Sequence, residues 1–263
     1  MFHNLAALVR YRGLIQSLVA RDLKARYRGS VLGFFWSFIN PLLLLLIYSF
    51  VFTYIIPARS PGHEPYALFM FCGILPWTWF SASLTEASGS LISGGNLIKK
   101  VLFPAEVLPI VSVLANMVHF FLGLPILGAF FLYYGRSIHP SDVLWLPVVV
   151  LVQLVLTLGL ALLVSALTVH FRDLRDLLAN LLTLWFFATP IIYSLDEAPE
   201  YVRPFMNINP FTHLAVSYQE VLFLPGPFEG WPRLLALGAA SLVVLAFGYF
   251  VFDRLRDTLA EEV

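Results

Sequence analysis

The chain has 263 residues, of which 59% are hydrophobic and only 12% are charged, and its mean hydropathy is +0.83. Soluble domains carry about a quarter charged residues, so this composition excludes a soluble globular protein and indicates one that crosses a membrane several times. Basic and acidic residues balance at 16 each, and Cys72 is the only cysteine, which excludes an intrachain disulfide.

Residues 1–29 predict a helix that lies flat on the cytoplasmic membrane surface. At about 100° per residue its basic side chains gather on one side. They are Arg10, Arg21, Lys24 and Arg28, and Arg26 belongs to the same basic segment. Its apolar side chains take the opposite side, with Leu5, Leu8, Ile15 and Val19. Such a helix holds its cations near anionic head groups and its apolar side in the acyl boundary. An amphipathic tail without a specific role fits the same periodicity equally well.

Six apolar spans are long enough to cross the hydrocarbon, which predicts an all-α membrane domain over residues 30–253. They cover residues 31–56, 66–85, 107–134, 143–169, 177–194 and 234–252. An even number of crossings returns the tail, residues 254–263, to the side of the N-terminus. With both tails inside, the cytoplasmic segments hold twelve Lys and Arg residues and the outer segments four. Because basic residues concentrate in cytoplasmic loops, this count predicts both termini in the cytoplasm.

Two predicted cytoplasmic loops place basic residues beside apolar ones. In the first, Asn96 is expected to cap a short helix over residues 97–103, which Pro104 closes. This helix is too short to cross the bilayer, so it is either a membrane-surface element or a docking element for another protein. The second loop carries Arg172 and Arg175, which a solvated turn with the usual cytoplasmic charges explains equally well.

The predicted outer segment 195–232 is too apolar for a solvated loop. Asn209 followed by Pro210 is a good helix start, since the missing N–H of proline falls where no partner is needed. We expect a pair of short re-entrant helices that dip into the outer leaflet and return, packed against protein or a wet cavity.

The sequence argues against three kinds of function. The glycine-rich run 88–96 has no Lys and Ser or Thr after its last glycines, so it is not a phosphate-binding loop. The six histidines lack metal-ligand spacing, and no metal site is expected. The spans hold almost no ionisable groups, which disfavours a carrier driven by an ion gradient.

Aromatic residues are abundant in the spans, and for most of them packing or the interfacial belt is a sufficient explanation. Two mixed faces nevertheless combine rings with neutral polar groups, on which a sugar chain can slide. The face on the first span holds Trp36, Asn40, Phe50 and Tyr54. The face on the fifth span holds Asn180, Thr183, Phe187 and Ile191. These eight residues are the candidate channel lining.

Several strings occur in the order and at the spacing of a known family. They are RDLKARY, GILPWTWF, NLIKKVLFP, HFRDLRDL, TPIIYS and NPFTHL. On these motifs, nearly the whole chain resembles the ABC-2 type export permeases that move O-antigen, capsular polysaccharide or teichoic acid. The resemblance implies a homodimer with a channel between the copies, in the bacterial inner membrane, exporting an undecaprenyl-linked glycan.

The resemblance also implies that a separate subunit, present in two copies, binds ATP and Mg and hydrolyses the nucleotide. This chain would then be a transport subunit without catalytic residues or a cofactor of its own. Force would reach it through the N-terminal surface helix and through a coupling helix in the first loop, where Ile98, Lys100, Phe103 and Pro104 match the family pattern. The implied ATPase contacts are Asn96, Leu97, Ile98, Lys99, Lys100, Phe103, Arg172 and Arg175.

Two other functions remain open at this point. One is an ABC-2 exporter of another cargo, such as teichoic acid, capsule, a lipid or a small molecule. The other is a membrane transferase acting on lipid-linked sugars, which needs acidic residues grouped at one membrane face. The acidic residues that it would use are scattered over both predicted sides: Glu86, Glu106, Asp142, Asp196 and Glu197.

Overall fold

The computed structural model describes residues 11–55, 65–100, 103–135, 140–224 and 227–262, and within them it contains helices and turns but no strand. The all-α prediction is therefore confirmed. The longer α-helices are α2 (Arg12–Arg26), α3 (Trp36–Phe50), α4 (Tyr66–Ser93), α6 (Val107–Tyr133), α8 (Leu146–His170), α9 (Leu174–Phe187), α11 (Pro210–Leu222) and α12 (Trp231–Glu262). The short ones are α5 (Gly95–Lys100), α7 (Pro140–Val143) and α10 (Arg203–Ile208). A π-helical turn, η2 (Val51–Ile55), continues α3, and the 3-10 turns are η1 (Gly33–Phe35) and η3 (Leu195–Glu197).

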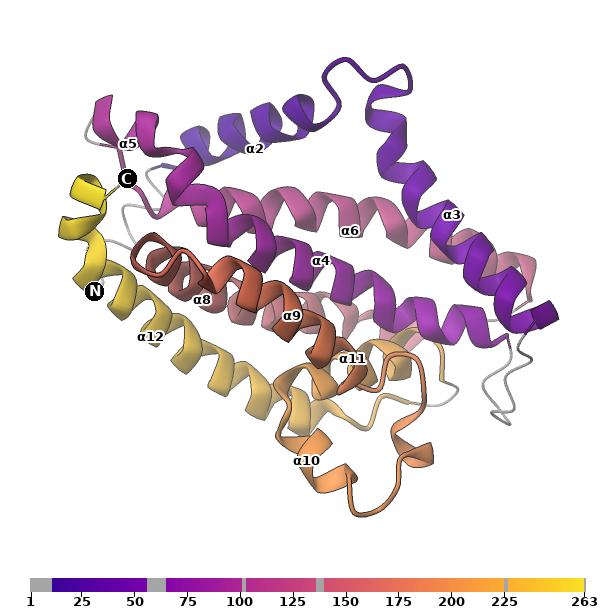
Figure 1. Cartoon of the computed structure of the whole chain (residues 1–263). Helices are drawn as coiled ribbons and strands as arrows, with labels where there is room; N and C mark the ends of the chain where they lie inside the picture. Colours follow the sequence, from indigo (N-terminus) through magenta and orange to yellow (C-terminus); the bar gives the residue numbers. More distant parts are fainter. Residues whose placement is uncertain (1–10, 56–64, 101–102, 136–139, 225–226, 263) are drawn as a thin grey trace.

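The long helices run roughly side by side (Figure 1). One end of the bundle carries α2, α5 and the last turns of α12, and we call it the α5 end; the opposite end carries α10 (Figure 1). Helix α4 forms the centre, with 83% of its apolar window buried against its neighbours, and it packs on α6 and α8. Helix α3 is the opposite case, with 11% of its window buried. It stands away from α4 and α6 where it leaves α2 and approaches them toward its other end (Figure 1).

Two glycines bring the backbones of α8 and α12 into direct contact. A Cβ atom on Gly248 would lie 2.1 Å from the carbonyl oxygen of Gly159, and one on Gly159 would lie 2.7 Å from the backbone of Leu245. Helices in membranes associate through such small residues because lipid provides no hydrophobic driving force between them. This contact makes α8 and α12 one rigid unit.

The prediction of six spans is not confirmed, because five helices in the described residues are long and apolar enough to cross. The predicted span 177–194 is wrong as a single helix: α9 ends at Phe187, and turns follow. Its 14 residues extend about 21 Å, less than the roughly 30 Å of hydrocarbon. Even so, α2 and the last turns of α12 lie at the same end of the bundle (Figure 1).

Asn209 links the turn after α9 to the start of α11. Its side-chain oxygen caps α11 by accepting from the backbone N–H of Phe211 at 2.9 Å, with Pro210 in the first turn, as predicted. The same oxygen accepts from the indole N–H of Trp185 at 2.6 Å, and its amide nitrogen donates to the hydroxyl of Thr189 at 2.9 Å. One amide thus joins the end of α9 to the start of α11. The predicted pair of short helices is present as α10 and α11; their entry into a bilayer stays a prediction.

Candidate functional site

A cavity of about 440 Å³ lies between α3 on one side and α4 and α6 on the other. We call it the aromatic cavity, because rings and neutral amides dominate its wall. Its lining includes Trp36, Asn40, Trp79, Asn116, His119 and Phe120. The rings of Trp79 and Phe120 pack with their centroids 5.2 Å apart, and the indole N–H of Trp79 donates to the carbonyl of Val113 at 3.1 Å. Trp79 is thus fixed in the wall, and its side chain is buried.

The α3 side of the aromatic cavity is held by hydrogen bonds to the segment that precedes it. The indole N–H of Trp36 donates to the hydroxyl of Ser30 at 3.1 Å, and the hydroxyl of Ser37 donates to that of Tyr27 at 2.7 Å. Asn40, by contrast, makes no hydrogen bond with another described residue, so its amide can bond a ligand.

A second cavity, of about 600 Å³, lies at the α5 end between α2, α4 and α6. We call it the polar cavity, because charged and hydroxyl side chains line it. They include Arg21, Asp22, Glu86, Ser90, Ser112 and Arg175. Leu97 of α5 also lines it, so the short helix and the surface helix meet around the same space.

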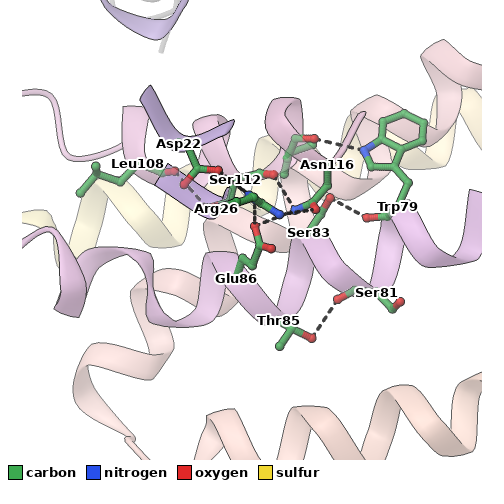
Figure 2. A network of polar contacts seen from close by, with 11 residues as sticks. Asp22, Arg26, Trp79, Ser81, Ser83, Thr85, Glu86, Leu108, Ser112 and Asn116 are labelled. Carbon is green, nitrogen blue, oxygen red and sulfur yellow. Dashed lines mark hydrogen bonds and ion pairs between the residues drawn. The ribbon is translucent and has the colours of Figure 1, made fainter. Parts of the chain in front are cut away.

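Arg26, in the last turn of α2, connects three helices (Figure 2). Its guanidinium donates to the carboxylate of Glu86 on α4 at 2.5 Å, to the amide oxygen of Asn116 on α6 at 3.2 Å, and to Asp22 on its own helix at 2.9 Å. Asn116 donates in turn to Glu86 at 2.7 Å. We call Arg26, Glu86 and Asn116 the polar junction. Burial disfavours the charged form of Arg26, but the carboxylates of Glu86 and Asp22 outweigh it, and the pKa of the guanidinium is raised.

Comparison with known proteins agrees with a bundle of membrane-spanning helices. The family model described as ABC-2 type transporter matches residues 13–223. The chain belongs to the ABC-2 type transporter family. It is therefore a subunit of a transport system, and the alternative of a membrane transferase is rejected.

Curated relatives cover all or nearly all of the chain. It is 42% identical to the O-antigen export system permease protein RfbA of Myxococcus xanthus over 266 residues, 100% of both chains. It is 32% identical to RfbA of Klebsiella pneumoniae over 94% of each chain. The polysialic acid transport protein KpsM of Escherichia coli is more distant, at 20% identity over 93% of this chain and 94% of its own.

The predicted coupling helix of the transporter begins earlier than expected. Asn96 does not cap it, since α4 continues to Ser93 and the chain turns at Gly94 directly into α5, which contains Asn96. Helix α5 is described as far as Lys100, and Phe103 is not helical. Leu97 and Phe103 pack inward on a cluster with Leu91, Leu108, Tyr249 and Phe252. Both therefore anchor the loop, whereas Asn96, Arg172 and Arg175 are exposed. The side chains of Ile98, Lys99 and Lys100 lie outside the described residues.

The surface helix of the transporter uses its apolar side differently from the prediction. Leu18 is buried against Val107 and Val111 of α6, so this side packs on protein where lipid was expected. Arg21, Lys24 and Arg28 are exposed, and Arg28 follows the end of the helix. Leu5, Leu8 and Arg10 lie outside the described residues.

The structure divides the candidate channel residues. Trp36 and Asn40 line the aromatic cavity, whereas Phe50 and Tyr54 do not; they are exposed farther along, with ring centroids 5.6 Å apart. On α9, three candidates are exposed: Asn180, Thr183 and Phe187. The assignment of Ile191 to that face is wrong, because it follows the helix end and is fully buried in the core.

Glu86 and Asn116 were not predicted from the sequence to be site residues. A carboxylate near the end of an apolar helix needs a partner, which is the signal that Glu86 carried. The partner itself lies 60 residues away in the chain, where no local pattern can indicate it.

Proposed function

We propose that the chain is the permease subunit of an ATP-driven exporter of O-antigen polysaccharide. The observation that carries this proposal is the 42% identity to an O-antigen permease over the full length of both chains. The polysialic acid transporter shares 20%, which supports the family but not its cargo. O-antigen is therefore favoured over capsule.

The proposed assembly is a homodimer in the bacterial inner membrane, with two ATP-binding subunits at the α5 end and both termini in the cytoplasm. Its substrate is an undecaprenyl-linked glycan. The placement of basic residues supports this orientation. Basic residues at the α5 end come from α2, α5, the turn before α9 and the last turns of α12, as expected for a cytoplasmic face. Asn96, Arg172 and Arg175 are exposed at the same end, where the ATP-binding subunits would bind.

The aromatic cavity is a suitable surface for a carbohydrate. Sugars have apolar faces that stack on rings and hydroxyls that bond to amides, and this wall offers both in Trp36 and Asn40. Neutral partners bind a sugar without holding it tightly, which suits transport.

Deletion of the gene in its host tests the cargo. We expect O-antigen to disappear from the cell surface and to accumulate as lipid-linked polymer inside, and the wild-type chain to restore export. Normal surface O-antigen together with loss of a different polymer would contradict the proposal. The comparison is made on extracts of the outer membrane and of the cytoplasmic membrane from the same culture.

Charge reversal in α5 tests the coupling role. The double variant K99E/K100E should stop export while ATP hydrolysis by the assembled complex continues, because the docking helix no longer transmits force. The matched control is R254E/R256E, which reverses two charges of α12 at the same end of the bundle. Unchanged export in K99E/K100E would remove α5 from the coupling path.

A further inference from the structure

The two cavities lie along the same pair of helix faces. On α4, residues spaced four apart pass from one cavity to the other: Thr78 and Ala82 line the aromatic cavity, Glu86 and Ser90 the polar cavity. On α6, Ser112 lines the polar cavity and the next two residues at that spacing, Asn116 and Phe120, line the aromatic cavity. Residues four apart share one face of a helix, so α4 and α6 form one groove that passes through both cavities.

A single side chain interrupts this groove. Arg26 is the one described residue that lines both cavities, and it bonds Glu86 and Asn116 at the level where the two cavities meet. Its side chain is 24% exposed, and Figure 2 shows the guanidinium between the two helices. We propose that the polar junction is a gate in this groove, closed by Arg26, and that its release joins the polar cavity to the aromatic cavity.

The connection between α2 and α3 permits such a release. Gly29 and Gly33 have φ angles of +81° and +51°, and a Cβ atom on either would meet nothing within 4 Å. Val31 between them is fully exposed. Leu18 holds α2 against α6 two turns before Arg26, so the end of the helix can swing about this contact. Opening then costs the ion pair with Glu86 and the bond to Asn116, and α4 and α6 keep their packing.

Thiol accessibility in membranes tests the gate independently of the cargo. In a C72A background, A82C reports on the aromatic cavity and S90C on the polar cavity. Vesicles that hold the full chain are treated with a membrane-impermeant cationic thiol reagent on the face from which S90C reacts. With Arg26 in place, A82C should react about ten-fold more slowly than S90C, since reagent access limits the reactivity of a cysteine.

Removal of the gate should make the two rates similar. R26A is expected to bring A82C to within about two-fold of S90C. R21A is the matched control, because Arg21 lines the polar cavity on the same helix without reaching the junction, and A82C should stay slow. If R26A does not fold, E86Q removes the ion pair at nearly constant volume and should also accelerate A82C. Equal rates in the parent, or a slow A82C in folded R26A, would overturn the proposal.

Discussion

The bundle combines two regions of opposite character. Around α4, α8, α11 and α12 the helices are packed so closely that Gly159 and Gly248 leave no room for a methyl group. Between α3 and the same α4, a cavity of about 440 Å³ stays open, and only 11% of the α3 window is buried. The difference indicates that one part of the chain is a rigid frame and that another is a wall with room to move. Substitutions in the frame should change stability, and substitutions in the wall should change transport.

The largest effect on stability is expected from G248A. Its Cβ atom would lie 2.1 Å from the carbonyl oxygen of Gly159, so α8 and α12 have to separate. Overpacking of this kind costs about 1–3 kcal/mol. The control is G128A on α6, where a Cβ atom meets nothing within 4 Å. Thermal unfolding of the purified chain should show a lower Tm for G248A and an unchanged or higher Tm for G128A; equal values would contradict the rigid frame.

Loss of the Asn209 cap should destabilise the link between α9 and α11. N209A removes the cap of α11 and the bonds to Trp185 and Thr189, and helix caps contribute about 1–2 kcal/mol. N207A, an exposed asparagine two residues earlier, is the control and should melt like the wild type. A wild-type Tm in N209A would mean that the other contacts of α11 hold it in place without this amide.

In the wall of the aromatic cavity, W36A should slow export with little change of Tm. A stacked ring contributes about 0.5–1.5 kcal/mol, which corresponds to about two- to ten-fold in rate. F50A is the control, because its ring lies on the same helix but outside the cavity. The rates of glycan export by W36A and F50A are compared at equal amounts of protein. Equal slowing in both variants would contradict a role of the aromatic cavity in glycan transport.

Whether a structural feature could be predicted from the sequence depends largely on how far apart in the chain its residues lie. The Asn209–Pro210 helix start and the five long spans follow from local capping and hydropathy, and they were predicted. The early end of α9 was not, because the apolar residues of 188–194 were given more weight than Pro190, which cannot continue a helix and follows the C-cap Ala188 by two residues. The polar junction was missed because Arg26, Glu86 and Asn116 lie far apart in the chain. Asn96 was misassigned because α4 extends past Glu86 to Ser93, which leaves only a turn at Gly94 before α5.

The smallest predicted effect on stability concerns Glu220 of α11. Its side chain is half-buried and accepts a hydrogen bond from the backbone N–H of Gly230. Burial raises the pKa of Glu220 above its ordinary value of 4.5, against the opposing charge of Arg233. The folded chain thus binds this proton more tightly than the unfolded chain. The resulting stability is present below the ordinary pKa and is lost as pH rises through the raised one. The Tm of the wild type relative to E220Q should therefore fall over this range, and a constant difference would contradict the shift.

Transport by purified components tests the central claim most directly, namely that this chain provides the path and its partner the energy. The chain is reconstituted in vesicles alone, with its ATP-binding subunit, and with a variant of that subunit that cannot hydrolyse ATP. Movement of lipid-linked glycan across the bilayer should require the active partner and ATP. Directed movement by the chain alone would contradict the account.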